Sequence, residues 1–458
     1  MSKKVNVLKG KWTTPLLSCF AEEIPMLRNG VSLKDAVSSN LAVFHCWFRR
    51  PYRYNERFVE ALRITQDLLE GGPDNADTMM LFECIPTLVK SLLGYAKMDI
   101  QVHVQEEIAF ALELFTAHKS GFGCQVLLKE PDFLSSVTLC LLEGTPNAQQ
   151  SCANCIRNIT LSPDYRPEII LQARGIREGF VKSLLFPTSP HSKYCTVFAL
   201  AAILKQTSSL DVRETLAFVR PLKKVLARSV VDEEIDLQLC ICHSFHNLAQ
   251  GNNDSRRAAL LDSDVQNILE SLLEVHLSNP HLRSLQVTLQ ILKIFGTLAQ
   301  GSEKQCQLLI KAGFFHSAKV VLEGSYDWKI VRETHWVCSN MVASLGPASA
   351  IAISKQLPLE DITQMAAHER MKVKVEALWT LVNIALHPEL VHALANPDII
   401  HCLGSNLLIK NTDLQFMRWS TFSPTLRTLP TSGSMTSWAK ELSGLENSKL
   451  FTSILLVA

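Results

Sequence analysis

The chain has 458 residues, of which 47% are hydrophobic and 19% are charged, and its formal net charge is +1. This composition provides enough apolar material for a large folded body and is unlike that of a disordered chain. A charge so close to neutral does not indicate a strongly basic nucleic-acid-binding protein, and we expect no direct contact with nucleic acid.

Thirteen cysteines are scattered along the sequence, and Cys152 and Cys155 form the only Cys-x-x-Cys pair. No second pair and no nearby histidine completes a zinc site, so we expect buried, reduced thiols and neither a metal nor a cofactor. The first residues contain no signal-peptide apolar run, and no stretch approaches the ~20 apolar residues that span a bilayer. We therefore expect a soluble, intracellular protein without a membrane-bound part.

Apolar residues recur at helical spacing along most of the chain. In chain order, the predicted helical segments are 104–115, 149–161, 194–204, 237–248, 285–298, 331–343 and 373–386. Turn-like sequences break the pattern at 71–73, 144–146, 251–254, 346–347 and 387–388. No alternating stretch is long enough to demand a sheet, so the sequence predicts an all-α protein.

The helical segments also repeat. The segment Asn-Leu-Ala-Gln-Gly at Asn247 is similar to Thr-Leu-Ala-Gln-Gly at Thr297. Aligning the helix ends on this position gives a column of residues: Leu114, Asn158, Ala202, Asn247, Thr297, Asn340 and Asn383. The spacings between neighbouring positions are 44, 44, 45, 50, 43 and 43 residues. All of them except the 50 fall in the range of roughly 40–47 residues that HEAT and armadillo units show. Such units stack on one another and share a continuous core.

We therefore expect a superhelical solenoid of about eight repeats over residues 51–425. Residues 1–50 are predicted to be an N-terminal capping segment. Residues 426–458 form a Ser/Thr-rich tail, which is either disordered or a poor cap.

Two of the predicted helices carry the same pattern, Glu-x-x-Trp-x-x-x-Asn. One contains Glu333, Trp336 and Asn340, and the other contains Glu376, Trp379 and Asn383. Residues three and four apart share a helix face, so each helix presents a carboxylate, an indole and an amide in one line. A single tryptophan on such a helix is usually a core residue. Two in register with asparagine, which is a poor core residue, favour a groove for an extended peptide.

The two helices resemble helices of the importin-α (karyopherin-α) family of armadillo-repeat proteins. The segment Gly301–Gly313 also resembles this family, because it reads Gly-Ser-Glu-Lys-Gln-Cys-Gln followed by an apolar run and Ala-Gly. The order also fits, because a basic residue, Lys293, stands at the tryptophan position of the preceding repeat, as at the family's minor site. The resemblance implies a monomeric, non-enzymatic adaptor of the cytoplasm and nucleus that binds basic nuclear localisation signals of cargo proteins. The peptide-binding residues that it implies are Glu303, Glu333, Trp336, Ser339, Asn340, Glu376, Trp379 and Asn383. Weaker candidates are Asn158, Asn247 and Lys293.

The sequence departs from the family in two places. At the positions of the family's major site, the tryptophan and asparagine pairs are replaced by Phe110/Leu114, Asn154/Asn158 and Phe198/Ala202. Only four lysines precede Trp12, where the family has an Arg/Lys-rich segment that binds importin-β. We therefore expect the working groove near residues 285–390 and no binding of importin-β by the chain alone.

Other interpretations stay open. Asparagine near a helix end can be a cap or a staple between repeats, which applies above all to Asn158 and Asn247. A general armadillo scaffold would take an acidic or folded partner, and a groove dominated by Lys293, Lys372 and Lys374 would favour it. A regulatory subunit built on a HEAT-like solenoid is a third class. No catalytic motif is recognisable, so we expect no enzyme.

Overall fold

The computed structural model describes residues 85–96, 102–118, 121–162, 168–206, 212–250, 254–279, 281–346, 356–357, 359–385 and 387, and isolated helical positions between 59 and 69. Every regular element in these residues is an α-helix, which confirms the predicted all-α class. The chain forms two compact units, Met1–Asp232 and Glu233–Ala458. The expected capping segment 1–50 and the tail 426–458 lie outside the described residues.

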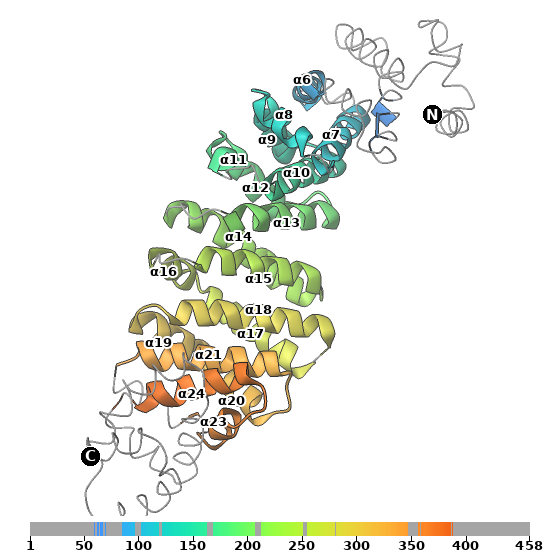
Figure 1. The fold of residues 1–458 in the computed structure, drawn as a ribbon. Coiled ribbons are helices and arrows are strands. Elements are labelled where there is room, and N and C mark those ends of the chain that lie inside the picture. Colours follow the sequence, from blue (N-terminus) through green and yellow to red (C-terminus); the bar gives the residue numbers. More distant parts are fainter. Residues whose placement is uncertain are drawn as a thin grey trace, which may run out of the picture. The chain divides into compact units, whose positions relative to one another are not determined.

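In the first unit, two shorter helices precede a longer one in each complete repeat (Figure 1). Its described helices are α6 (Ile85–Ala96), α7 (Val102–Ala117), α8 (Phe122–Lys129), α9 (Phe133–Glu143), α10 (Pro146–Leu161), α11 (Glu168–Gln172), α12 (Ile176–Leu185), α13 (Pro190–Gln206) and α14 (Val212–Val231). The triplets α8–α10 and α11–α13 are complete repeats of three helices. Neighbouring repeats pack in two layers, one made by α6, α9, α12 and α14 and the other by α7, α10 and α13.

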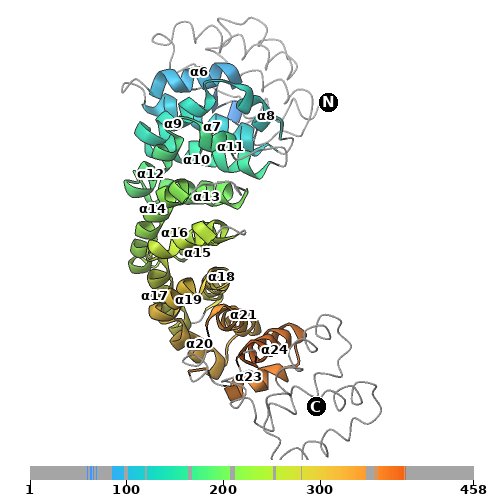
Figure 2. The same cartoon turned by 90° about the vertical axis from the view of Figure 1, so that its left-hand side faces the viewer.

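The second unit continues the same plan. Its described helices are α15 (Ile235–Ala249), α16 (Asp254–Asp262), α17 (Val265–Ser278), α18 (Leu282–Ala299), α19 (Glu303–Ala312), α20 (Phe314–Glu323), α21 (Trp328–Ser344), α23 (Leu359–Ala366) and α24 (Met371–Ala385). The third helices of successive repeats, α15, α18, α21 and α24, pack side by side, and the second helices α17, α20 and α23 form the other layer (Figure 2). Three helices per repeat distinguish an armadillo unit from the two-helix HEAT unit.

The predicted helical segments coincide with the third helices α7, α10, α13, α15, α18, α21 and α24, apart from Leu386, which lies outside the described residues. The predicted breaks also have a local cause. Thr145 accepts a hydrogen bond at its Oγ1 from the backbone N–H of Ala148 (3.3 Å), and Pro146 occupies the first turn of α10. Another break, which was not predicted, lies at Gly313: this residue alone separates α19 from α20, and its φ of 108° is a backbone angle that residues with a side chain rarely adopt.

The core lies between the layers and is shared by neighbouring repeats. Phe295 of α18 and Phe314 of α20 are fully buried and meet edge to face, with ring centroids 5.6 Å apart. The described cysteines are all buried and free, as expected, and no cluster of potential metal ligands is found among the described residues. None of the helices in the described ranges combines the length and apolar character that crossing a membrane requires.

Candidate functional site

The two predicted Glu-Trp-Asn lines lie on α21 and α24, the last two third helices that the structure describes, which pack side by side (Figure 1). Trp336 and Asn340 on α21 and Trp379 and Asn383 on α24 are all partly exposed. The structure therefore brings two indoles and two amides onto adjacent helices, at corresponding positions of successive repeats.

Both asparagines staple their repeat to the preceding one. Asn340 donates from Nδ2 to the carbonyl oxygen of Gly296 on α18 at 3.1 Å. Asn383 donates from Nδ2 to the carbonyl oxygen of Ser339 at 3.0 Å and lies 2.9 Å from the Ser339 hydroxyl oxygen. In each case the acceptor belongs to the residue just before the one that aligns with asparagine in the preceding repeat: Gly296 precedes Thr297, and Ser339 precedes Asn340. The amide is thereby held in one orientation by a contact that spans a whole repeat.

The staples leave part of each polar group available. The amide oxygens of Asn340 and Asn383 accept no hydrogen bond from the part of the chain that the structure describes. The indole N–H groups of Trp336 and Trp379 also have no partner within those residues. Because all four side chains are partly exposed, two acceptors and two donors are open to a ligand.

Trp336 rests on the backbone of the preceding repeat. A methyl group at Gly296 would overlap the six-membered ring of its indole, so the ring lies directly against α18 at this glycine. Gly296 therefore provides both the space for the indole and the carbonyl that holds Asn340. A residue without Cβ is needed here because of close packing, with no unusual backbone angle involved.

The carboxylates of the two lines lie in different surroundings. Glu333 is buried and pairs with its neighbour Arg332. Glu376 on α24 is partly exposed; burial raises the pKa of its carboxyl, and the positive charge of Arg332 lowers it in part. Arg332 therefore acts on both acids, and the charge around the indoles is more balanced than the three predicted acidic residues suggest.

The other predicted residues lie apart from the indoles or inside the packing. Ser339 is buried and accepts from Asn383. Glu303 is exposed in the first turn of α19, and its carboxylate lies beside Gly346, just beyond the end of α21. Asn247 on α15 and Lys293 on α18 are partly exposed. Burial lowers the pKa of His246 on α15 to about 4, and the charge of Lys293 adds to this effect, so these two residues are close.

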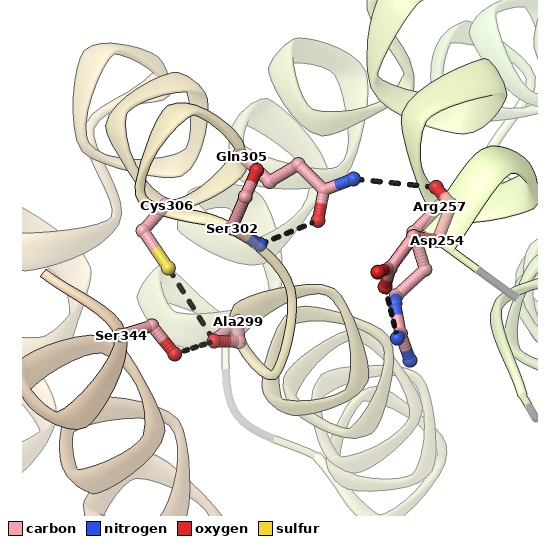
Figure 3. A network of polar contacts seen from close by, with 7 residues as sticks. All are labelled: Asp254, Arg257, Ala299, Ser302, Gln305, Cys306 and Ser344. Atoms are coloured by element: carbon pink, nitrogen blue, oxygen red, sulfur yellow. Dashed lines mark hydrogen bonds and ion pairs between the residues drawn. The ribbon is translucent and has the colours of Figure 1, made fainter. Parts of the chain in front are cut away.

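The Gly-Ser-Glu-Lys-Gln segment that carries part of the resemblance serves the stacking of repeats (Figure 3). Gln305 accepts at Oε1 from the backbone N–H of Ser302 at 3.0 Å, which caps α19, and donates from Nε2 to the carbonyl of Asp254 at 3.3 Å. The Ser344 hydroxyl and the Cys306 thiol both donate to the carbonyl of Ala299. These contacts join two successive repeats, α16–α18 and α19–α21, without contributing a side chain to the lines on α21 and α24.

In the first unit, the aligned positions form a different arrangement. Asn158 donates from Nδ2 to Oγ1 of Thr116 at 3.1 Å, and Asn154 donates to Oε1 of Glu113 at 2.8 Å. Burial raises the pKa of Glu113, against hydrogen bonds from Ser151 and Asn154 that lower it. Asn158 is therefore a staple between α7 and α10, one of the two alternatives that the sequence left open, and no indole accompanies it.

Comparison with known proteins adds information on the fold. No protein-family model matches the chain, and no curated protein matches it either. Among solved structures, a crystallised engineered protein is 18% identical over 85% of this chain and 98% of its own, with a TM-score of 0.55. A designed armadillo repeat protein in complex with the peptide (KR)4 is 18% identical over 55% of this chain and 98% of its own, with a TM-score of 0.46.

The chain is an all-α solenoid of armadillo-type repeats. The three-helix unit and the two-layer stacking establish this fold in the described residues, and the similarity to the engineered protein agrees with it. Two residues of the site were not predicted from the sequence, Gly296 and Arg332. Arg332 stands four residues before Trp336 and so shares its helix face, which is a signal that the spacing could have provided.

Proposed function

We propose that this armadillo-type solenoid is a non-enzymatic interaction scaffold and that its second unit binds an extended peptide across α21 and α24. The observation that carries the proposal is the repeated pair of a partly exposed indole and a stapled amide on neighbouring third helices. A peptide that crosses both helices needs partners for its backbone groups, and amide oxygens held in fixed orientation accept from its N–H groups. With adjacent helices packed about 8–10 Å apart, an extended chain advances two to three residues per repeat.

The two indoles favour long side chains between them. An aliphatic stem packs on the ring face, and a cationic head gains about 0.5–2 kcal/mol from the ring's quadrupole. Glu376 is the acidic member of the lines that remains partly exposed, and it can receive a lysine or arginine head. These features support a basic linear motif as the ligand, and with it the role of an import adaptor for nuclear localisation signals that acts as a monomer in the cytoplasm and nucleus.

One observation favours a second candidate, a scaffold for an acidic peptide. Arg332 already pairs with Glu333 and lies close enough to Glu376 to lower the pKa of its carboxyl. A basic ligand therefore competes with Arg332 for Glu376, whereas an acidic ligand would find Arg332 at the same place. The two candidates share the groove and differ in the charge of the side chains between the indoles.

Fluorescence anisotropy with two labelled peptides of equal length, one Lys/Arg-rich and one Asp/Glu-rich, separates these candidates. We expect the basic peptide to bind in the micromolar range and the Trp379→Ala variant to bind it at least tenfold more weakly, which is about 1.4 kcal/mol. Trp328→Ala is a matched control, because this indole is covered by the Arg370 guanidinium, 5.0 Å from the ring centroid, and lies outside the two lines. Tighter binding of the acidic peptide that is equally sensitive to Trp379→Ala would establish the second candidate. Binding that Trp379→Ala and Trp328→Ala affect equally would refute the groove.

A further inference from the structure

The first unit contains an open cavity of about 510 Å3 lined by residues of α12 and α14. These two helices belong to the layer of second helices and pack against each other (Figure 2). It lies on other helices than the indole and amide lines and belongs to the other compact unit. Its floor is apolar and is formed by Leu185, Leu216, Ala217 and Pro221.

Three exposed cations line the same cavity, Arg213, Arg220 and Lys224. None of them makes an ion pair or a hydrogen bond with the residues that the structure describes. The sequence of α14 contains five basic residues and one acidic residue, Glu214. No acidic residue is among the residues that line the cavity, so its rim is positively charged.

The spacing places these cations and the floor on one face of α14. Counted from Arg213, the lining residues of this helix follow at three, four, seven, eight and eleven positions. This is the pattern of a single amphipathic stripe, and it extends along roughly 16 Å of the helix at 1.5 Å per residue. The stripe is therefore long enough to contact about three turns of a helical partner.

The proline adds an acceptor to this surface. Pro221 lies inside α14 and has no N–H to donate to the carbonyl of Ala217, four residues earlier. Both residues line the cavity, and Ala217 is exposed. A backbone carbonyl that its own helix cannot fully satisfy is a place for an N–H donor from a ligand.

We propose that this cavity is a second docking site, which binds an acidic segment of a partner protein through apolar anchor residues flanked by carboxylates. Apolar anchors fill the floor, and Asp or Glu side chains pair with Arg213, Arg220 and Lys224. A nucleic acid is less suited, because its phosphates have no apolar group for the floor and the lining has no aromatic ring on which a base could stack. A membrane surface is also less suited, because it is flat on this scale and the three cations line a hollow surface.

The probe is a labelled amphipathic peptide whose acidic residues are spaced by seven and four positions, to match Arg213, Arg220 and Lys224, with leucines between them. Binding to the full chain is measured by fluorescence anisotropy at low and moderate salt. We expect Arg220→Glu with Lys224→Glu to weaken binding at least tenfold. The control is Lys90→Glu with Lys129→Glu, which makes the same change in net charge at exposed positions of α6 and α8 and is expected to leave the affinity within about twofold.

Ala217→Glu is an independent test, because it places a carboxylate on the exposed part of the floor; we expect it to weaken binding by a similar factor. Circular dichroism of each variant verifies that it is folded. Equal losses in the charge-reversed variant and the control would refute a defined site. Tighter binding of single-stranded DNA or of phosphatidylserine vesicles than of the acidic peptide would refute the proposed partner, an acidic protein segment. Trp379→Ala is expected to leave binding of this peptide unchanged, which separates the site from the groove on α21 and α24.

Discussion

Changing Glu270 to glutamine tests a buried carboxyl that connects two repeats of the second unit. Glu270 of α17 is 2% exposed, and its Oε1 accepts a hydrogen bond from the hydroxyl of Ser317 on α20. Its Oε2 has no hydrogen-bond partner within the part of the chain that the structure describes. Burial raises the pKa of this carboxyl from its ordinary value of 4.5 to about 7; the Ser317 hydrogen bond lowers it, and Glu274 adds to the increase.

The raised pKa determines the sign of the pH dependence. Between pH 4.5 and 7 the unfolded chain has released the proton of this carboxyl and the folded chain retains it. The free energy of unfolding therefore falls as pH rises through this window, by about 3 kcal/mol in total, and is level above it. Glutamine keeps the size of the side chain and the acceptor for Ser317, but its buried amide N–H₂ costs about 1–3 kcal/mol without a partner.

We expect Glu270→Gln to raise the free energy of unfolding by about 1–2 kcal/mol at pH 8 and to lower it by about 1–2 kcal/mol at pH 4.5. Urea denaturation followed by circular dichroism at both pH values measures the difference between variant and parent. The control is Glu274→Gln on the same helix, which is exposed and should change stability little at either pH. A difference between Glu270→Gln and the parent that does not vary with pH would refute the reasoning, because the carboxyl would then be ionised in the folded chain.

Two further predictions concern α21. Gly296→Ala is expected to lower the free energy of unfolding by about 1–3 kcal/mol, because the added methyl group must displace the Trp336 indole; a change in tryptophan emission and weaker peptide binding would accompany the loss. His335 is fully buried, neither ring nitrogen has a hydrogen-bond partner among the described residues, and burial lowers its pKa to about 3. The free energy of unfolding therefore decreases as pH falls from 6.5 toward 3, by about 3 kcal/mol at pH 4. His335→Leu should remove this decrease, and urea denaturation of variant and parent at pH 7 and pH 4 measures it.

The sequence predicted those features of the molecule that depend on neighbours along the chain. The third helices have regular apolar spacing, and the turn at 144–146 combines glycine, the capping residue Thr145 and proline, so these helices and this turn were predicted at the right positions. The turn at Ser302, which has a capping box, was not among the predicted breaks. The repeat spacing also has a physical cause: Asn340 bonds to Gly296 and Asn383 to Ser339, 44 residues earlier in both cases. What pattern alone could not determine is the environment on each helix face, because that depends on the register of the adjacent repeat.

Glu333 and Glu376 illustrate this limit. They occupy the same position in their repeats, yet Glu333 is buried and paired with Arg332 while Glu376 is partly exposed. The local sequence around them differs at the fourth residue before the tryptophan, which is Arg332 on α21 and Val375 on α24. The residue directly before each glutamate, Arg332 on α21 and Val375 on α24, therefore distinguishes the two carboxylates, and the repeated Glu-x-x-Trp-x-x-x-Asn pattern does not include this position.

The asparagine staples raise the question of whether stacking alone accounts for the two lines. Thr297 replaces asparagine in the column on α18, and its hydroxyl donates to the carbonyl of Lys293 in its own helix. α18 nevertheless packs side by side with α15. Between α18 and α21, the Ser344 hydroxyl donates to Ala299 in addition to the Asn340 staple, so that interface has a second polar contact across it.

Stacking therefore tolerates the loss of the column asparagine, at a cost of about 1 kcal/mol for one hydrogen bond. Stacking also gives no reason for a partly exposed indole four positions before each staple at Asn340 and Asn383. An indole that remains partly exposed forgoes part of the free energy of burial that a core position would provide. The coincidence of both features on α21 and α24 is expected if the amide and the indole contact the same ligand, and it is this coincidence that the Trp379→Ala measurement tests.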